Sequence, residues 1–95
     1  MNRVRQRTGR HARAVMSDHR WLLLPLAARA AWLHLTDIGD VMPELRQPRA
    51  GQSVSVNEIS RLLAASPEEM SAVLGHLAER QIVEPVGTGW RLKAY

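Results

Sequence analysis

The sequence predicts a mainly α-helical domain that ends in a small β-hairpin, which is an α+β fold class. Two short stretches with helical apolar spacing lie on either side of residues 65–69, and two β-rich stretches flank the glycines of residues 87–89. A Leu- and Ala-rich stretch that begins at residue 21 precedes them. It supplies apolar surface on which the shorter elements can pack, so one small core is expected.

Residues 1–20 are expected to form a flexible, arginine-rich arm. This segment carries six arginines against one acid, Asp18, which gives it a charge of +5. Up to residue 17 it has almost no large apolar groups, so it cannot bury enough surface to offset the entropy of ordering. Residues 21–95 carry a charge of −1 and are predicted to be the folded domain. The basic character of the chain therefore belongs to the arm.

The first helix of the folded domain is predicted to start near Pro25, which suits a first helical turn, and to end near residues 36–39. Apolar residues fall on several adjacent stripes of this helix, so it should be central and packed on more than one side. Three tryptophans are expected to belong to the core, where each indole N–H needs a partner: Trp21, Trp32 and Trp90.

A loop and a short strand are expected next. Residues 39–51 contain two glycines and two prolines, and residues 52–56 alternate polar and apolar side chains, as a strand does. Asn57 is placed to cap the following helix, whose apolar face is Ile59, Leu62 and Leu63. These features predict a strand that leads directly into a helix.

Capping residues mark the break before the last helix. Ser66 can cap it, Pro67 fits its first position, and Glu69 can close a capping box. Its apolar residues recur at i, i+3, i+4 and i+7: Met70, Val73, Leu74 and Leu77. Residues 82–86 and 90–95 then form the hairpin, and Pro85 places its strand at an edge because proline cannot donate to a ladder.

The predicted order is helix, strand, helix, helix, strand, strand, and this order resembles the winged helix-turn-helix domain. Two stretches are similar to the winged-helix domains of phage and plasmid replication proteins. They are Trp21-x-x-Leu-Pro-x-Ala-Ala-Arg29-x-x-Trp32 and Val56-Asn-Glu-Ile-Ser-Arg-Leu-Leu63. The resemblance covers residues 21–95 and implies a nucleic-acid-binding role.

The last helix is the expected recognition helix. Its outer face offers small and polar side chains for DNA contact: Ser71, Ala72, Gly75 and His76. Residues 67–81 nevertheless carry a net charge of −2, whereas direct base readout favours Arg, Lys, Asn and Gln. Gly75 is costly in a helix interior, so it points either to close approach of a ligand or to packing against a neighbouring helix.

Positive charge for phosphate contacts is expected from other elements. Arg91 and Lys93 fall on the outer face of the hairpin, and Arg61 lies on the preceding helix, with Arg46 and Arg49 in the loop as further cations. The alternative is that these side chains form an ordinary solvated surface. The arm contributes the arginines that resemble groove-binding basic tails: Arg3, Arg5, Arg7, Arg10 and Arg13. For the arm, the alternative is a solubilising tail.

No enzyme, metal site or cofactor is expected. The chain lacks cysteine, and its four histidines do not fall into metal-ligand spacings: His11, His19, His34 and His76. Glu68 and Glu69 are adjacent on a helix and better explained as complements to its positive N-terminus. No secretory signal or membrane-spanning run is recognised, and a cytoplasmic location is expected.

The predicted function is that of a DNA-binding winged-helix protein, a regulator of transcription or replication. A phage origin of this protein is one interpretation. It would bind double-stranded DNA and contact phosphates through the hairpin, which is the wing of such a domain, and through the basic arm. The alternative is a protein-interaction module, an adaptor or inhibitor that does not bind DNA directly. Convergence of the predicted cations on one face would favour DNA. The oligomeric state stays open, with a dimer among the options.

Overall fold

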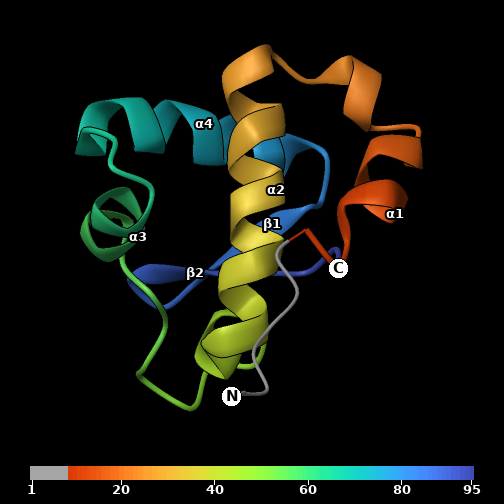
Figure 1. Ribbon diagram of the computed structural model, residues 1–95. Helices are drawn as coiled ribbons and strands as arrows, with labels where there is room; N and C mark the ends of the chain where they lie inside the picture. The colour runs from red at the N-terminus through yellow and green to blue at the C-terminus, as the bar shows by residue number, and fades with distance from the viewer. Residues whose placement is uncertain (1–8) are drawn as a thin grey trace, which may run out of the picture.

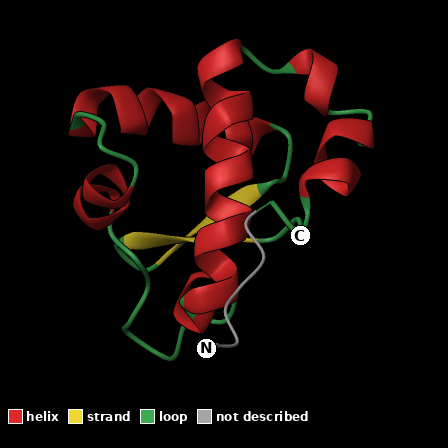
Figure 2. Ribbon diagram, viewed as in Figure 1, coloured by secondary structure: helices red, strands yellow, loops and turns green. Residues whose placement is uncertain are grey.

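The computed structural model describes residues 9–95, and this part of the chain folds as an α+β domain. Figure 1 shows helix α2 (Leu26–Val41) between α1 (Ala12–Ser17) on one side and α3 (Val56–Leu62) with α4 (Pro67–Glu79) on the other. Strands β1 (Val83–Val86) and β2 (Gly89–Leu92) form a two-stranded antiparallel hairpin, drawn in yellow in Figure 2. Two 3₁₀ helices complete the described elements: η1 (Trp21–Leu23) and η2 (Pro43–Leu45).

Helix α2 carries one wall of the core. Pro25 is its N-cap, one position before the first turn in which it was expected. Trp32 on α2 is fully buried, and its indole N–H donates to the Ala94 carbonyl at 3.3 Å. Its ring also contacts those of Trp21 and Tyr95, with centroids 6.4 and 6.1 Å away. The predicted partner for a buried indole is therefore present, and it joins α2 to the end of the described chain.

Both predicted helices of the pair are present, and the break between them lies where the capping residues place it. Ser66 is the N-cap of α4, and its hydroxyl accepts the backbone N–H of Glu69 at 3.1 Å. Before the break, Ala64 has a φ of 55°, and the Ala65 N–H donates to Ser60, five residues earlier, as in a Schellman-type helix end. The N-cap of α3 is Ser55; the expectation that Asn57 caps this helix is wrong.

The strand expected at residues 52–56 is reduced to a single bridge between Val54 and Trp90. At this bridge the Trp90 N–H donates to the Val54 carbonyl at 2.8 Å. A Cβ at Gly89 would lie only 2.5 Å from that carbonyl oxygen, so the close approach requires glycine. The helix cap at Ser55 then ends the extended segment, because Ser55 directly follows Val54 and α3 begins at Val56.

The expected boundary at residue 21 is not where the packed structure begins. Residues 12–17 form α1, and its Val15 is fully buried in the core with the side chains of α2. Asp18, directly after α1, accepts hydrogen bonds from the Arg20 side chain and from the Tyr95 hydroxyl. The flexible-arm interpretation is therefore wrong for residues 9–20, because one buried valine and several polar contacts hold them. Residues 1–8 lie outside the described part.

Candidate nucleic-acid interface

Helix α4 presents the outer face that the sequence predicted. Its four buried residues are those of the predicted apolar stripe: Met70, Val73, Leu74 and Leu77. Its four candidate contact residues are exposed: Ser71, Ala72, Gly75 and His76. No heavy atom other than those of its own helix backbone and chain neighbours lies within 4 Å of a Cβ built at Gly75. Packing inside the described chain therefore does not explain this glycine.

The electrostatics of α4 are unfavourable for a DNA ligand. Glu68 and Glu69 occupy its first turn, and Glu79 is its last residue, while Arg80 follows as C-cap. Acids near a helix N-terminus are stabilising because they complement the helix dipole. They also repel phosphate, so α4 can approach a duplex only if cations elsewhere hold it there.

The hairpin cations Arg91 and Lys93 are already engaged by an acid. Glu84 lies opposite Arg91 in the strand register, and its carboxylate is 2.8 Å from the Arg91 guanidinium and 3.5 Å from the Lys93 ammonium. The hydrogen bond from Arg91, together with the charge of Lys93, holds the pKa of Glu84 below its usual range. The three side chains therefore carry a net charge of only +1.

Arg46, expected as an additional phosphate contact, serves instead as a structural hub. Its guanidinium is 3.0 Å from the Asp40 carboxylate and donates to the main-chain oxygens of Thr36 and Tyr95. Its own carbonyl accepts from Arg91. This side chain thus ties α2, β2 and the described C-terminal residue together, and few of its donors remain for a ligand.

Asp40 also pairs with residues at the start of α1, so these residues and Arg46 form one charged cluster around its carboxylate. His11 lies 3.0 Å from its carboxylate, and Arg10 lies 3.8 Å away with more than half of its side chain exposed. Burial alone would raise the pKa of Asp40, but the hydrogen bond with His11 and the charges of His11, Arg10 and Arg46 lower it. The cluster orients the start of the described chain along the C-terminal half of α2.

The first described residue, Gly9, is held beside the C-terminal half of α2. The Gly9 N–H donates to both oxygens of Asp37, at 2.9 and 3.1 Å. Arg13 on α1 is exposed and has no ion-pair partner among the described residues. The remaining arm candidates, Arg3, Arg5 and Arg7, lie outside the described residues.

The predicted cations within residues 9–95 do not converge on one face. Arg61 is exposed on α3 and makes no ion pair within residues 9–95. Figure 1 places α3 and α1, which carries Arg13, on opposite sides of α2. Arg91 points toward Arg46, at the end of the molecule where α2 finishes. The structure therefore distributes the cations around the body.

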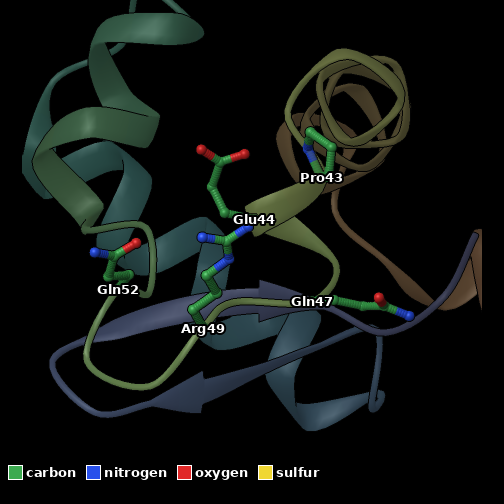
Figure 3. Close-up of a pocket in the computed structure, with 5 residues that line it drawn as sticks. All are labelled: Pro43, Glu44, Gln47, Arg49 and Gln52. Carbon is green, nitrogen blue, oxygen red and sulfur yellow. The ribbon is translucent and has the colours of Figure 1, made fainter.

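A polar hollow of about 450 Å³ lies beside the loop after α2. Figure 3 shows Arg49 extending toward Glu44 in this hollow, while the side chain of Gln47 turns away. Pro43 and Gln52 complete its lining. Because it contains one cation and one acid, the hollow offers no net positive charge to a phosphate.

Three leucines outside the predicted site are exposed in η1 and at the start of α2: Leu22 (76%), Leu23 (53%) and Leu26 (79%). Leu26 begins α2, a helix that was expected to pack on more than one side, but its side chain is mostly exposed. Leu24, directly before the N-cap Pro25, is the buried leucine of this stretch.

No family model, no curated protein and no solved structure matches this chain. Within residues 9–95, no group of three or more His, Asp or Glu side chains is placed to hold a metal ion. Among the helices described there, none has the length and apolar character needed to cross a bilayer.

Proposed function

We propose that this chain is a winged helix-turn-helix module that binds double-stranded DNA mainly through phosphate contacts. Helices α3 and α4 would be the helix-turn-helix pair, and the hairpin would be the wing. The element order supports this assignment, because a capped break separates the two helices and the antiparallel hairpin follows directly. The single bridge at Val54 stands where the first strand of such a domain would pair.

The exposed face of α4 is the observation that carries the proposal. Its central residues are small, and no other part of the described chain crowds Gly75. A helix interior tolerates glycine at a cost of about 1 kcal/mol relative to alanine, and this cost is explained if a ligand backbone comes close there. The small side chains Ser71 and Ala72 leave the same approach open.

Affinity would come from cations outside α4. Arg13 and Arg61 are exposed and free of ion pairs within the described residues, and three further arginines precede residue 9. Because α1 with Arg13 and α3 with Arg61 lie on opposite sides of α2, these two cations do not line one groove. We therefore expect weak dependence on DNA sequence and strong dependence on salt.

The test is a fluorescence anisotropy titration of a labelled 24-base-pair duplex at about 50 mM salt. We expect a dissociation constant of roughly 10⁻⁴–10⁻⁶ M at physiological salt, the range typical of non-specific binding, and tighter binding at about 50 mM. Changing Arg13 and Arg61 together to Gln should weaken binding several-fold. The matched control, Arg49→Gln, removes one exposed cation from the polar hollow and should have a smaller effect than Arg13→Gln or Arg61→Gln alone.

A protein-docking role without DNA contact is the second candidate, and the acidic face of α4 favours it. Glu68, Glu69 and Glu79 would suit a basic surface on a partner protein. Absence of duplex binding at about 50 mM salt would contradict the DNA proposal and favour this candidate.

A further inference from the structure

Arg46 is held in place by every nitrogen of its guanidinium group. Its Nε donates to the main-chain oxygen of Tyr95 at 3.1 Å, and its Nη2 donates to the Thr36 carbonyl at 3.0 Å. Its Nη1 lies 3.0 Å from the Asp40 carboxylate. The group also lies directly against α2, because a Cβ built at Gly39 would be only 2.7 Å from its Cζ and Nη1 atoms. Gly39 therefore leaves open the space that the guanidinium occupies.

Arg91 in the hairpin is attached to Arg46 through the main chain. The Arg91 Nε donates to the Arg46 carbonyl at 3.1 Å, and its Nη1 donates to Glu84 at 2.8 Å. Its remaining nitrogen, Nη2, has no hydrogen-bond partner within residues 9–95, and 34% of the side chain is exposed. Because a guanidinium is planar and rigid, bonds at two of its nitrogens fix the orientation of the third.

We propose that Arg46 is a positioning residue, which holds Arg91 so that its Nη2 donates to one phosphate of a bound duplex. This inference rests on the DNA-binding function proposed above and assigns one phosphate contact to it. The Arg46 carbonyl is a neutral acceptor, so it orients Arg91 without cancelling its charge, whereas Glu84 cancels part of it. A donor that is oriented before the duplex arrives loses less side-chain entropy on binding. Arg46 acts only through Arg91, because its own nitrogens are already engaged.

The change Gly39→Ala separates this role from that of a structural anchor. The added methyl group would take the place of the Arg46 guanidinium and displace it, while the net charge stays the same. The displaced group is the end of a flexible side chain, and alanine is the best helix former, so the variant should fold. A thermal melt checks this. If the melt is not cooperative, Arg46→Lys replaces the variant, because lysine keeps the charge but has one nitrogen where arginine has three.

The first measurement is the Nε–H signal of Arg91 in the NMR spectrum of the isotope-labelled protein, identified by its absence in Arg91→Gln. In wild type its proton should exchange with water roughly fivefold more slowly than that of the exposed Arg61, which is the protection that one hydrogen bond confers. Gly39→Ala should remove this protection. Gly75→Ala, where nothing outside the helix's own backbone lies near the added methyl group, is the control for this signal and should keep it. Unchanged protection in Gly39→Ala would overturn the proposal.

The second measurement is duplex binding between about 50 and 200 mM salt. Gly39→Ala should weaken binding several-fold and make its salt dependence shallower by about one phosphate contact, although its charge equals that of wild type. In a protein that already carries Arg91→Gln, the same change should have no effect. A similar loss in both proteins, or wild-type affinity and slope in Gly39→Ala, would overturn this inference alone. No duplex binding by wild type would overturn the DNA-binding function, and the phosphate contact of Arg91 with it.

Discussion

At the scale of single residues, Glu84 controls how much positive charge the hairpin can offer. Its carboxylate engages both Arg91 and Lys93. The change Glu84→Gln should release both cations and strengthen duplex binding several-fold, with a steeper salt dependence. Glu44→Gln is the matched control, because it removes one acid from the loop without releasing the hairpin cations. Equal gains in both variants would mean that only net charge matters, and that the hairpin makes no phosphate contact.

Asp18 should make the stability of the protein sensitive to acid. Hydrogen bonds from Arg20 lower the pKa of Asp18 below its usual range, and the Tyr95 hydroxyl adds a further one. A carboxylate with a lowered pKa stabilises the folded state above its unfolded pKa of about 3.9, and this contribution is lost as the pH falls toward the folded pKa.

The measurement is the free energy of unfolding by urea between pH 7 and pH 2. It should decline below about pH 4 in wild type, and it should decline less steeply in Asp18→Asn, which is less stable at pH 7. Parallel curves for the two proteins would show that the Asp18 contacts do not contribute.

At the scale of elements, α1 should behave as part of the folded domain. Val15→Ala removes fully buried methyl groups and should lower the free energy of unfolding by about 2 kcal/mol. Met16→Ala, one residue later and half exposed, is the control and should cost less. Chemical denaturation measures both. If the two variants were equally stable, α1 would not be packed as described.

Helix α4 allows stability and function to be separated at one position. Gly75→Ala should stabilise the protein by about 0.5–1 kcal/mol, because nothing outside its own helix backbone lies near the added methyl group. The same change should weaken duplex binding if the DNA backbone approaches this face closely. A variant that gains stability and keeps its full affinity would show that DNA contacts another face.

At the scale of the whole molecule, local signals were sufficient for most of the fold. Ser66 and Pro67 start α4, and the apolar spacing from Met70 to Leu77 gives its buried face; both follow from neighbouring residues in the chain. The hairpin also forms where its glycines predict it. The pairing of Glu84 with Arg91 did not follow from the predicted strands, because residues 82–86 and 90–95 would place Glu84 opposite Leu92, whereas the observed register pairs Val86 with Gly89 and Glu84 with Arg91.

The remaining features depend on contacts between distant segments. His11 is hydrogen-bonded to Asp40, which lies 29 positions away in the chain. Val15 is buried only because α2 and the rest of the core pack around it. Composition alone therefore made residues 9–20 resemble a free arm. The expected strand at residues 52–56 fails for a related reason, since β2 offers it only the single pairing at Trp90.

The salt dependence of duplex binding tests the central claim most directly. The intact protein and a variant with Arg3, Arg5 and Arg7 changed to Gln would be titrated against one duplex from about 50 to 200 mM salt. We predict that the logarithm of the binding constant falls linearly with the logarithm of salt concentration. The slope for the variant should be shallower by an amount that corresponds to the loss of up to about three phosphate contacts. Binding that does not change with salt, or identical slopes for the two proteins, would contradict phosphate-driven DNA binding by the N-terminal arginines.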